Sequence, residues 1–200
     1  MTERVDRTLL LVRHGQYRST AVPGSEPDGP LTDIGREQAQ LTAERLRDYP
    51  VQTIHHSPLQ RAVETAHILA AALPHATLNP SPLLRECIPC VPPGAERFFA
   101  HIPADFIARG EAQARAAFAA FVAPLGSGGE ETAVCDLIVS HGNLLGYLAS
   151  QVVQAPAASW LRFDIQQCGI IELAVSFDNW VKLVRHNDTG HLPPNLRLFV

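Results

Sequence analysis

Two apolar runs, far apart in the chain, each end at a histidine followed by a glycine. Residues 9–12 lead through an arginine into His14, and residues 137–139 lead through a serine into His141. Short continuous apolar runs of this kind predict buried strands of a parallel sheet. Ligands of such sheets bind at the carboxyl ends of the strands. We therefore expect His14 and His141 to lie at one functional edge.

A third segment adds an arginine to the same edge. Ser57 and Pro58 are typical of the N-cap and first position of a helix, which places Arg61 in its first turn. Arg13 immediately precedes the first of the two histidines. Two arginines and two histidines that converge on one edge predict a site for a phosphate group.

Strand and helix patterns alternate along the chain, which predicts an α/β fold with a three-layer, doubly wound, mostly parallel sheet. We expect helices from the N-cap Thr32 to before Pro50, from Pro58 onward and after His141. We expect strands over residues 8–12, 51–55, 76–79, 137–140, 170–175 and 180–184, of which the last two form a hairpin. A polar loop is expected over residues 21–30. Between Glu86 and His141 the pattern loosens into a small insertion over the active-site edge, with one amphipathic helix that includes Ala114 and Phe121 and a glycine-rich stretch at 126–129.

Length and composition limit the classes of protein to consider. Two hundred residues with 46% hydrophobic content predict a single domain over residues 1–200. The net charge of −4 and the absence of lysine or arginine clusters argue against nucleic acid as a partner. No apolar run approaches the ~20 residues of a membrane-spanning helix, and the N-terminus does not resemble a targeting segment. We expect a cytoplasmic protein without a membrane partner.

The cysteines raise the question of a redox or metal site. Cys87 and Cys90 have the spacing of a C-x-x-C motif, but nearby prolines disfavour the helix start that a redox motif needs. Cys135 and Cys168 do not form the second ligand pair of a zinc site. Reduced, unpaired thiols are the preferred interpretation.

The candidate site suits phosphoryl transfer. The transferred group spreads negative charge over its equatorial oxygens, so a catalyst needs cations and donors from several directions. Arg13, Arg61 and His141 would supply them, and Gly142 would let a backbone amide approach. We expect His14 to be the nucleophile because neighbouring cations keep its imidazole neutral. Neither a metal nor another cofactor is predicted, since two arginines would repel a cation held by the histidines.

A phosphate ester also needs an acid that protonates its leaving oxygen. Glu86, in the segment 83–86, is the candidate, acting first as acid and then as base toward water. The predicted catalytic set is therefore His14, Glu86, His141, Arg13 and Arg61. The predicted phosphate-binding set is Arg13, His14, Arg61, His141 and Gly142.

These motifs, in this order, resemble the histidine phosphatase superfamily, the phosphoglycerate-mutase-like proteins. The segments that carry the resemblance are residues 11–15, 31–32 with 35–39, 57–58 with 61–62 and 64–66, 84–86, and 140–143. The resemblance implies a phosphohistidine at His14, proton donation by Glu86, and a phosphate pocket completed by Arg13, Arg61 and His141.

Within the superfamily, the chain is most similar to the branch of phosphoglycerate-mutase-like serine/threonine protein phosphatases. It has Gly15 where they have serine, and we expect it to lack their N-terminal anchor. We expect a metal-independent phosphatase of phosphate monoesters that acts on phosphoserine or phosphothreonine proteins. A small-metabolite phosphatase, a mutase-type phosphotransferase and a catalytically weak scaffold are the alternatives, and a homodimer is an alternative to a monomer.

Overall fold

The fold is built on one six-stranded sheet with the strand order β3-β2-β4-β1-β5-β6. The computed structural model describes residues 5–20, 26–123, 134–176 and 180–198. The strands are β1 (Val5–Arg13), β2 (Thr53–His56), β3 (Thr77–Pro80), β4 (Val134–Ser140), β5 (Ile170–Ser176) and β6 (Val181–Asp188). The four strands from β3 to β1 pair in parallel, and β5 and β6 are antiparallel. The predicted mostly parallel sheet is confirmed, including the closing hairpin.

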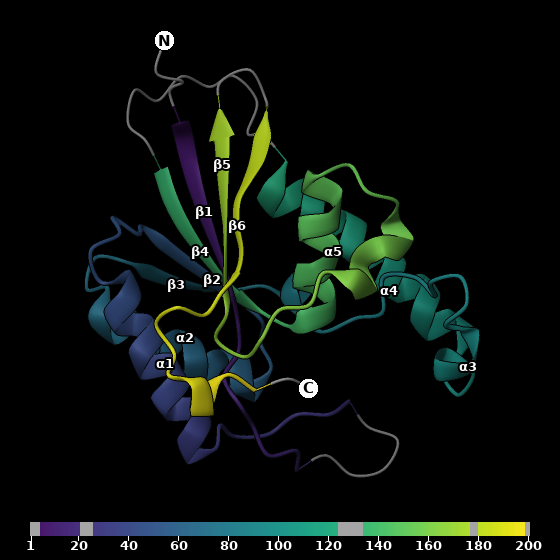
Figure 1. Cartoon of the computed structure of the whole chain (residues 1–200), viewed down its shortest axis with the longest axis horizontal. Helices are drawn as coiled ribbons and strands as arrows, with labels where there is room; N and C mark the ends of the chain where they lie inside the picture. The colour runs from purple at the N-terminus through teal and green to yellow at the C-terminus, as the bar shows by residue number, and fades with distance from the viewer. Residues whose placement is uncertain (1–4, 21–25, 124–133, 177–179, 199–200) are drawn as a thin grey trace.

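Helices cover both faces of this sheet (Figure 1). The helices are α1 (Asp33–Leu46), α2 (Gln60–Ala72), α3 (Glu96–Phe99), α4 (Ala104–Ala117) and α5 (Gly142–Val152). Leu10 and Val12 of β1 belong to a core with α1 and α2, whereas Leu9 and Leu11 belong to a core with α4 and α5. Successive strand residues point to opposite faces, so a strand covered on both sides needs apolar residues at every position. This explains the continuous run at residues 9–12 and confirms the three layers.

The pairing of β1 with β4 places the two histidines side by side. Arg13 is in register with Ser140, and the His14 amide donates to the Ser140 carbonyl at 2.9 Å. His14 and His141 therefore follow the last paired residues of adjacent strands. As predicted, both lie at the carboxyl edge of the parallel strands.

The insertion contains α3, α4 and η2 (Phe118–Val122), a π-helical extension of α4. Turn η1 (Pro82–Leu84) comes just before it, and η3 (Ala157–Arg162) and η4 (Pro194–Leu196) follow later in the chain. The Ser140 hydroxyl donates to the Leu84 carbonyl at 2.8 Å and so ties the segment before the insertion to β4. Gly110 of α4 lies so close to residue 88 that a Cβ there would be 2.4 Å from the Ile88 carbonyl oxygen. The glycine-rich stretch 126–129 lies outside the described residues, as does part of the predicted loop at 21–30.

Several element boundaries differ from the sequence-based expectation, most clearly at the starts of α2 and β1. The helix predicted to begin at Pro58 begins at Gln60, and Ser57 is not its N-cap. Instead, the carboxylate of Asp28, from a distant loop, accepts the Gln60 amide at 2.9 Å. The first strand begins earlier than predicted, at Val5, because pairing with β5 extends it through polar residues. Thr32 caps α1 as expected, accepting the Gly35 amide at 3.0 Å.

Candidate active site

Hydrogen bonds at both ring nitrogens determine the tautomer of His14. Its Nδ1 lies 2.8 Å from the Gly15 carbonyl oxygen, which can only accept a hydrogen bond. Its Nε2 lies 3.1 Å from Nε of Arg61, which can only donate one. The proton of the neutral imidazole therefore resides on Nδ1, and the lone pair of Nε2 faces Arg61.

Burial and positive charge keep this imidazole neutral. His14 is 3% exposed. Burial lowers the pKa of His14 well below its usual value, and the neighbouring charges of Arg61 and Arg13 lower it further. A ring that stays neutral retains the lone pair that a nucleophile needs.

His141 lies beside His14 but has a different partner. The two ring centroids are 5.0 Å apart. His141 Nε2 lies 2.8 Å from the hydroxyl oxygen of Ser57, while its buried Nδ1 has no partner among the described residues. Burial lowers the pKa of His141 well below its usual value, and the charge of a protonated His14 and the nearby arginines act in the same direction.

Arg13 reaches the site from the last residue of β1. Its Nη1 donates to the Ile165 carbonyl at 2.7 Å, and its buried Nε has no partner among the described residues. A Cβ on Gly142 would lie 3.3 Å from the guanidinium carbon of Arg13, closer than most such contacts. A glycine at the start of α5 therefore accommodates Arg13 at the helix N-terminus, where backbone amides are free to bind an anion.

Arg61 is held in place on several sides. Besides His14, it contacts the Pro27 carbonyl at 2.6 Å and the Asp28 carboxylate at 3.2 Å through Nη1. Its guanidinium carbon lies 4.5 Å from the centroid of the Tyr17 ring, within the range of a cation–π contact. These contacts fix its planar donor group at the site before any ligand binds.

Glu86 lies close to the same charges and has a raised pKa. Burial is the largest cause, opposed by hydrogen bonds from the backbone amides of Cys87 and Asn143 and by the charges of Arg13 and Arg61. Glu86 also lines a cavity of about 160 Å³ between the segment 85–87 and α4. A carboxyl group that stays protonated to higher pH beside a cavity can act as a general acid.

The structure thus brings Arg13, His14, Arg61, Glu86, His141 and Gly142 together at one edge. Three supporting residues are not predicted from the sequence: Ser57, whose pattern is that of a helix cap, and Tyr17 and Asp28, for which no role is expected. No local pattern could have identified Asp28, because its contacts with Gln60 and Arg61 join segments more than 30 residues apart. Ser57 could have been recognised only by its position at the end of β2.

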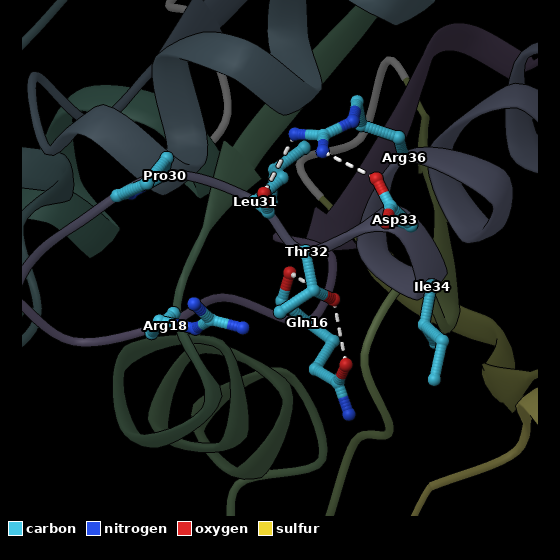
Figure 2. Close-up of a pocket in the computed structure, with 8 residues that line it drawn as sticks. All are labelled: Gln16, Arg18, Pro30, Leu31, Thr32, Asp33, Ile34 and Arg36. Atoms are coloured by element: carbon cyan, nitrogen blue, oxygen red, sulfur yellow. Dashed lines mark hydrogen bonds and ion pairs between the residues drawn. The ribbon is translucent and has the colours of Figure 1, made fainter.

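A second pocket, of about 590 Å³, lies next to this edge at the start of α1 (Figure 2). Gln16, Arg18 and Thr32 line it, but none of the predicted site residues does. The exposed Arg36 donates to the Leu31 carbonyl at 2.7 Å and pairs with the Asp33 carboxylate at 2.6 Å. In this pocket, Arg36 of α1 therefore holds the preceding loop against the start of the helix.

The cysteines and possible metal ligands are the other candidate features of the sequence. Among the described residues, no group of three His, Cys, Asp or Glu side chains could hold a metal ion. Cys87 and Cys90 are free thiols, and burial raises the pKa of both. A raised pKa lowers the fraction of reactive thiolate. Within the described ranges of the chain, no helix is long and apolar enough to cross a bilayer.

Comparison with known proteins agrees with this geometry. Residues 9–89 match the model of the histidine phosphatase superfamily, branch 1. The serine/threonine-protein phosphatase PGAM5 of mouse, a mitochondrial protein, is 32% identical over 98% of this chain and 69% of its own length. A phosphoglycerate mutase structure from Plasmodium falciparum is 27% identical, covers 94% of each chain and has a TM-score of 0.63. YhfR of Bacillus stearothermophilus is 21% identical over 94% of this chain and 100% of its own, with a TM-score of 0.72, and supports the fold alone.

The similarity corrects the expected location. A cytoplasmic protein was expected, but the PGAM5 relatives from mouse, rat and human are mitochondrial proteins. Composition and the absence of an apolar segment cannot distinguish two aqueous compartments, which is the reason that this prediction was wrong.

The family match and the fold lead to one assignment. The superfamily model covers the segment from His14 to Glu86, and the mouse relative extends the match over nearly the whole chain. The structural neighbours have the same α/β fold. The chain belongs to the histidine phosphatase superfamily and is a phosphatase that acts on phosphorylated substrates.

Proposed function

We propose that this phosphatase hydrolyses phosphoserine and phosphothreonine in proteins through a phosphohistidine at His14. The observation that carries the proposal is the lone pair of His14 Nε2, defined by Gly15 on one side of the ring and Arg61 on the other. Phosphohistidine formation needs this lone pair, held neutral among cations. When Arg61 Nε donates to the phosphate in place of His14, the lone pair of Nε2 becomes available to attack phosphorus.

In the first step, His14 Nε2 attacks phosphorus and the bond from phosphorus to the serine or threonine oxygen breaks. Glu86 donates its proton to this leaving oxygen, which is otherwise a strongly basic alkoxide. The raised pKa of Glu86 supports this role because it keeps the carboxyl group protonated at higher pH.

In the second step, water replaces the protein product. The Glu86 carboxylate takes a proton from the water, and the water oxygen attacks phosphorus as the bond to His14 breaks. Inorganic phosphate leaves and Glu86 is again protonated. The same residue thus serves as acid and then as base.

The phosphoryl oxygens need donors throughout both steps. We assign Arg13, Arg61, His141 and the amide of Gly142 to this role. The buried Arg13 Nε and His141 Nδ1, which have no partner among the described residues, support the assignment because an oxygen of the phosphoryl group would satisfy both. His141 Nδ1 would then carry a proton, with the Ser57 hydroxyl donating to Nε2. No metal ion has a part in this scheme, and metal independence stays a prediction.

The choice of phosphoproteins as substrates follows the mouse relative, whose name describes a serine/threonine-protein phosphatase. Small phosphate esters are the competing substrates, and mutase chemistry is the competing reaction. The oligomeric state, a monomer or a homodimer, stays a prediction that sedimentation tests. The single domain over residues 1–200 also stays a prediction, and limited proteolysis tests it.

The experiment compares catalytic efficiency on phosphoserine and phosphothreonine peptides with that on small phosphate esters. We expect higher kcat/KM on the peptides. During turnover, the wild-type enzyme should carry phosphate that is labile in acid and stable in base, and mapping should place it on His14. A preference for small esters would reject the protein substrate, and phosphate transfer between two positions of one ester would favour a mutase.

A further inference from the structure

One arginine near the active site has no part in the proposed phosphate pocket. Arg85 directly precedes Glu86, and its charge contributes to the lowered pKa of His141. Arg85 and Glu86 line the same cavity, so Arg85 lies beside the proposed general acid. Its side chain is 40% exposed, in contrast with 4% for Arg61.

The backbone of Arg85 is held firmly by two neighbouring elements. The Gln113 side-chain amide on α4 donates to the Arg85 carbonyl at 2.7 Å and to the Leu83 carbonyl at 3.2 Å. The adjacent Leu84 is fully buried, and its carbonyl accepts the Ser140 hydroxyl. The guanidinium thus projects from a fixed base.

Arg85 lines the cavity of about 160 Å³ that Glu86 also lines. Phe106 and Arg109 of α4 form another part of its wall. Gly110 keeps this wall close to residue 88, since any larger side chain would meet the Ile88 carbonyl. A group bound to the leaving oxygen of a substrate would lie near Glu86, which lines this cavity.

The partner of Arg85 in the free enzyme is a carboxylate from a distant loop. Glu26 forms an ion pair with Arg85, and its side chain is 31% exposed. Two residues further along, Asp28 pairs with Arg61. The loop thus places one carboxylate on each of two arginines around the site. An exposed pair of this kind is weak and can exchange partners.

We infer that Arg85 determines substrate specificity by binding a carboxylate of the substrate next to the phosphate ester, in place of Glu26. The inference rests on the proposed function and extends it: the preferred phosphoprotein has an aspartate or glutamate beside its phosphoserine or phosphothreonine. The planar guanidinium suits this ligand because it can donate two parallel hydrogen bonds to a carboxylate. Arg109, which pairs with Asp105 in the free enzyme, lines the same cavity.

The test uses phosphopeptides that differ only in the residues flanking phosphoserine, aspartate and glutamate in one and asparagine and glutamine in the other. Hydrogen bonds to charged groups contribute about 1.5–3 kcal/mol, so wild type should prefer the acidic peptide by about tenfold or more in kcat/KM. In Arg85→Gln this ratio should fall to near one, and in Arg85→Glu a lysine-flanked peptide should become the better substrate. Arg47→Gln, at an exposed arginine following α1, is the matched control and should keep the wild-type ratio.

A second variant examines the exchange with Glu26. Glu26→Gln removes the competing carboxylate, so kcat/KM for the acidic peptide should rise a few-fold, while the ratio stays dependent on Arg85. A wild-type ratio near one, or an unchanged ratio in Arg85→Gln, would overturn the inference.

A third arm separates this inference from the protein substrate itself. The probes are 3-phosphoglycerate, which carries a carboxylate, and glycerol 3-phosphate, which does not. If 3-phosphoglycerate exceeds every peptide and Arg85→Gln abolishes that advantage, the carboxylate site stands and the phosphoprotein proposal fails. If peptides are the better substrates but their charge has no effect, the phosphoprotein proposal stands and the role of Arg85 is rejected.

Discussion

The phosphate pocket and its rim contain the same types of charged residue but hold them differently. In the pocket, Arg61 and His14 are almost completely buried and bonded to each other. At the rim, the pairs of Arg85 with Glu26 and of Arg109 with Asp105 are substantially exposed. Burying a charge costs free energy unless fixed partners compensate it, whereas an exposed pair costs little and gains little. The pocket is therefore built for one chemical group, and the rim can adapt to different substrates.

The strongest test of the pocket is removal of its nucleophile. His14→Ala should lower kcat by at least about 10³-fold on every substrate, because His14 Nε2 is the proposed nucleophile and Nε2 of the neighbouring His141 is engaged with the Ser57 hydroxyl. His67→Ala, at an exposed histidine on α2, is the control. The comparison breaks down if His14→Ala keeps more than a few per cent of the wild-type rate.

Replacement of the acid should depend on the leaving group. Glu86→Gln should lose about 10²–10⁴ in kcat/KM on phosphoserine peptides and much less on p-nitrophenyl phosphate, whose leaving anion is already stable. Arg61→Ala should reduce both alike because it binds the phosphoryl group that the two share. The control is Glu111→Gln, whose carboxylate pairs with Arg115 on α4. Equal losses for Glu86→Gln on both substrates would assign the proton to another donor, with His141 the next candidate.

Replacement of Ser57 tests the buried hydrogen bond between its hydroxyl and His141. Without its hydroxyl, nothing holds Nε2 of His141 as an acceptor, so Ser57→Ala should lower kcat by about tenfold, the value of a hydrogen bond of ~1.4 kcal/mol. Ser57→Thr should restore most of this loss. Equal kcat values for the alanine variant and wild type, or a change in thermal stability alone, would assign Ser57 a structural role.

The pocket should also influence the pH dependence of stability. The folded protein holds His14 and His141 at a lowered pKa, so below pH ~6.5 the unfolded chain binds protons that the folded one does not. The free energy of unfolding should therefore fall as pH drops below ~6.5, by up to about 1.4 kcal/mol per pH unit for each histidine. His14→Gln should flatten this slope in urea titrations between pH 6.5 and 5.5. Glu86, whose pKa is raised, also contributes to the pH dependence, but it is present in both proteins. The difference between the wild-type and variant curves of unfolding free energy therefore isolates His14, and the two curves should run parallel above pH 7.5.

Metal removal should have the smallest effect. Exhaustive chelation should leave kcat and KM on phosphopeptides within error of the untreated enzyme, since the proposed charges on the phosphate come from side chains. Addition of Mg²⁺ or Zn²⁺ to the chelated enzyme is the control. Restoration of a lost activity by either ion would reverse the metal-free scheme.

Much of the fold and the positions of the candidate site residues could be predicted from the sequence. The apolar runs before His14 and His141 specify strands that are buried on both faces, and the register of β1 with β4 places their ends together. Arg61 was expected near a helix start, and it lies there even though the helix begins two residues later than predicted. These predictions succeeded because strand ends and helix starts are encoded by neighbouring residues.

The sequence alone determined which residues could carry the chemistry, since residue type and local pattern define strand ends, helix starts and ionisable groups. Only the tertiary structure decided how these residues are paired. The contacts of Asp28 with Arg61, Glu26 with Arg85 and Ser57 with His141 join positions 33, 59 and 84 residues apart. The tautomer of His14 likewise depends on Arg61, 47 residues away. Contacts between distant segments result from packing of the whole chain, which no local pattern records.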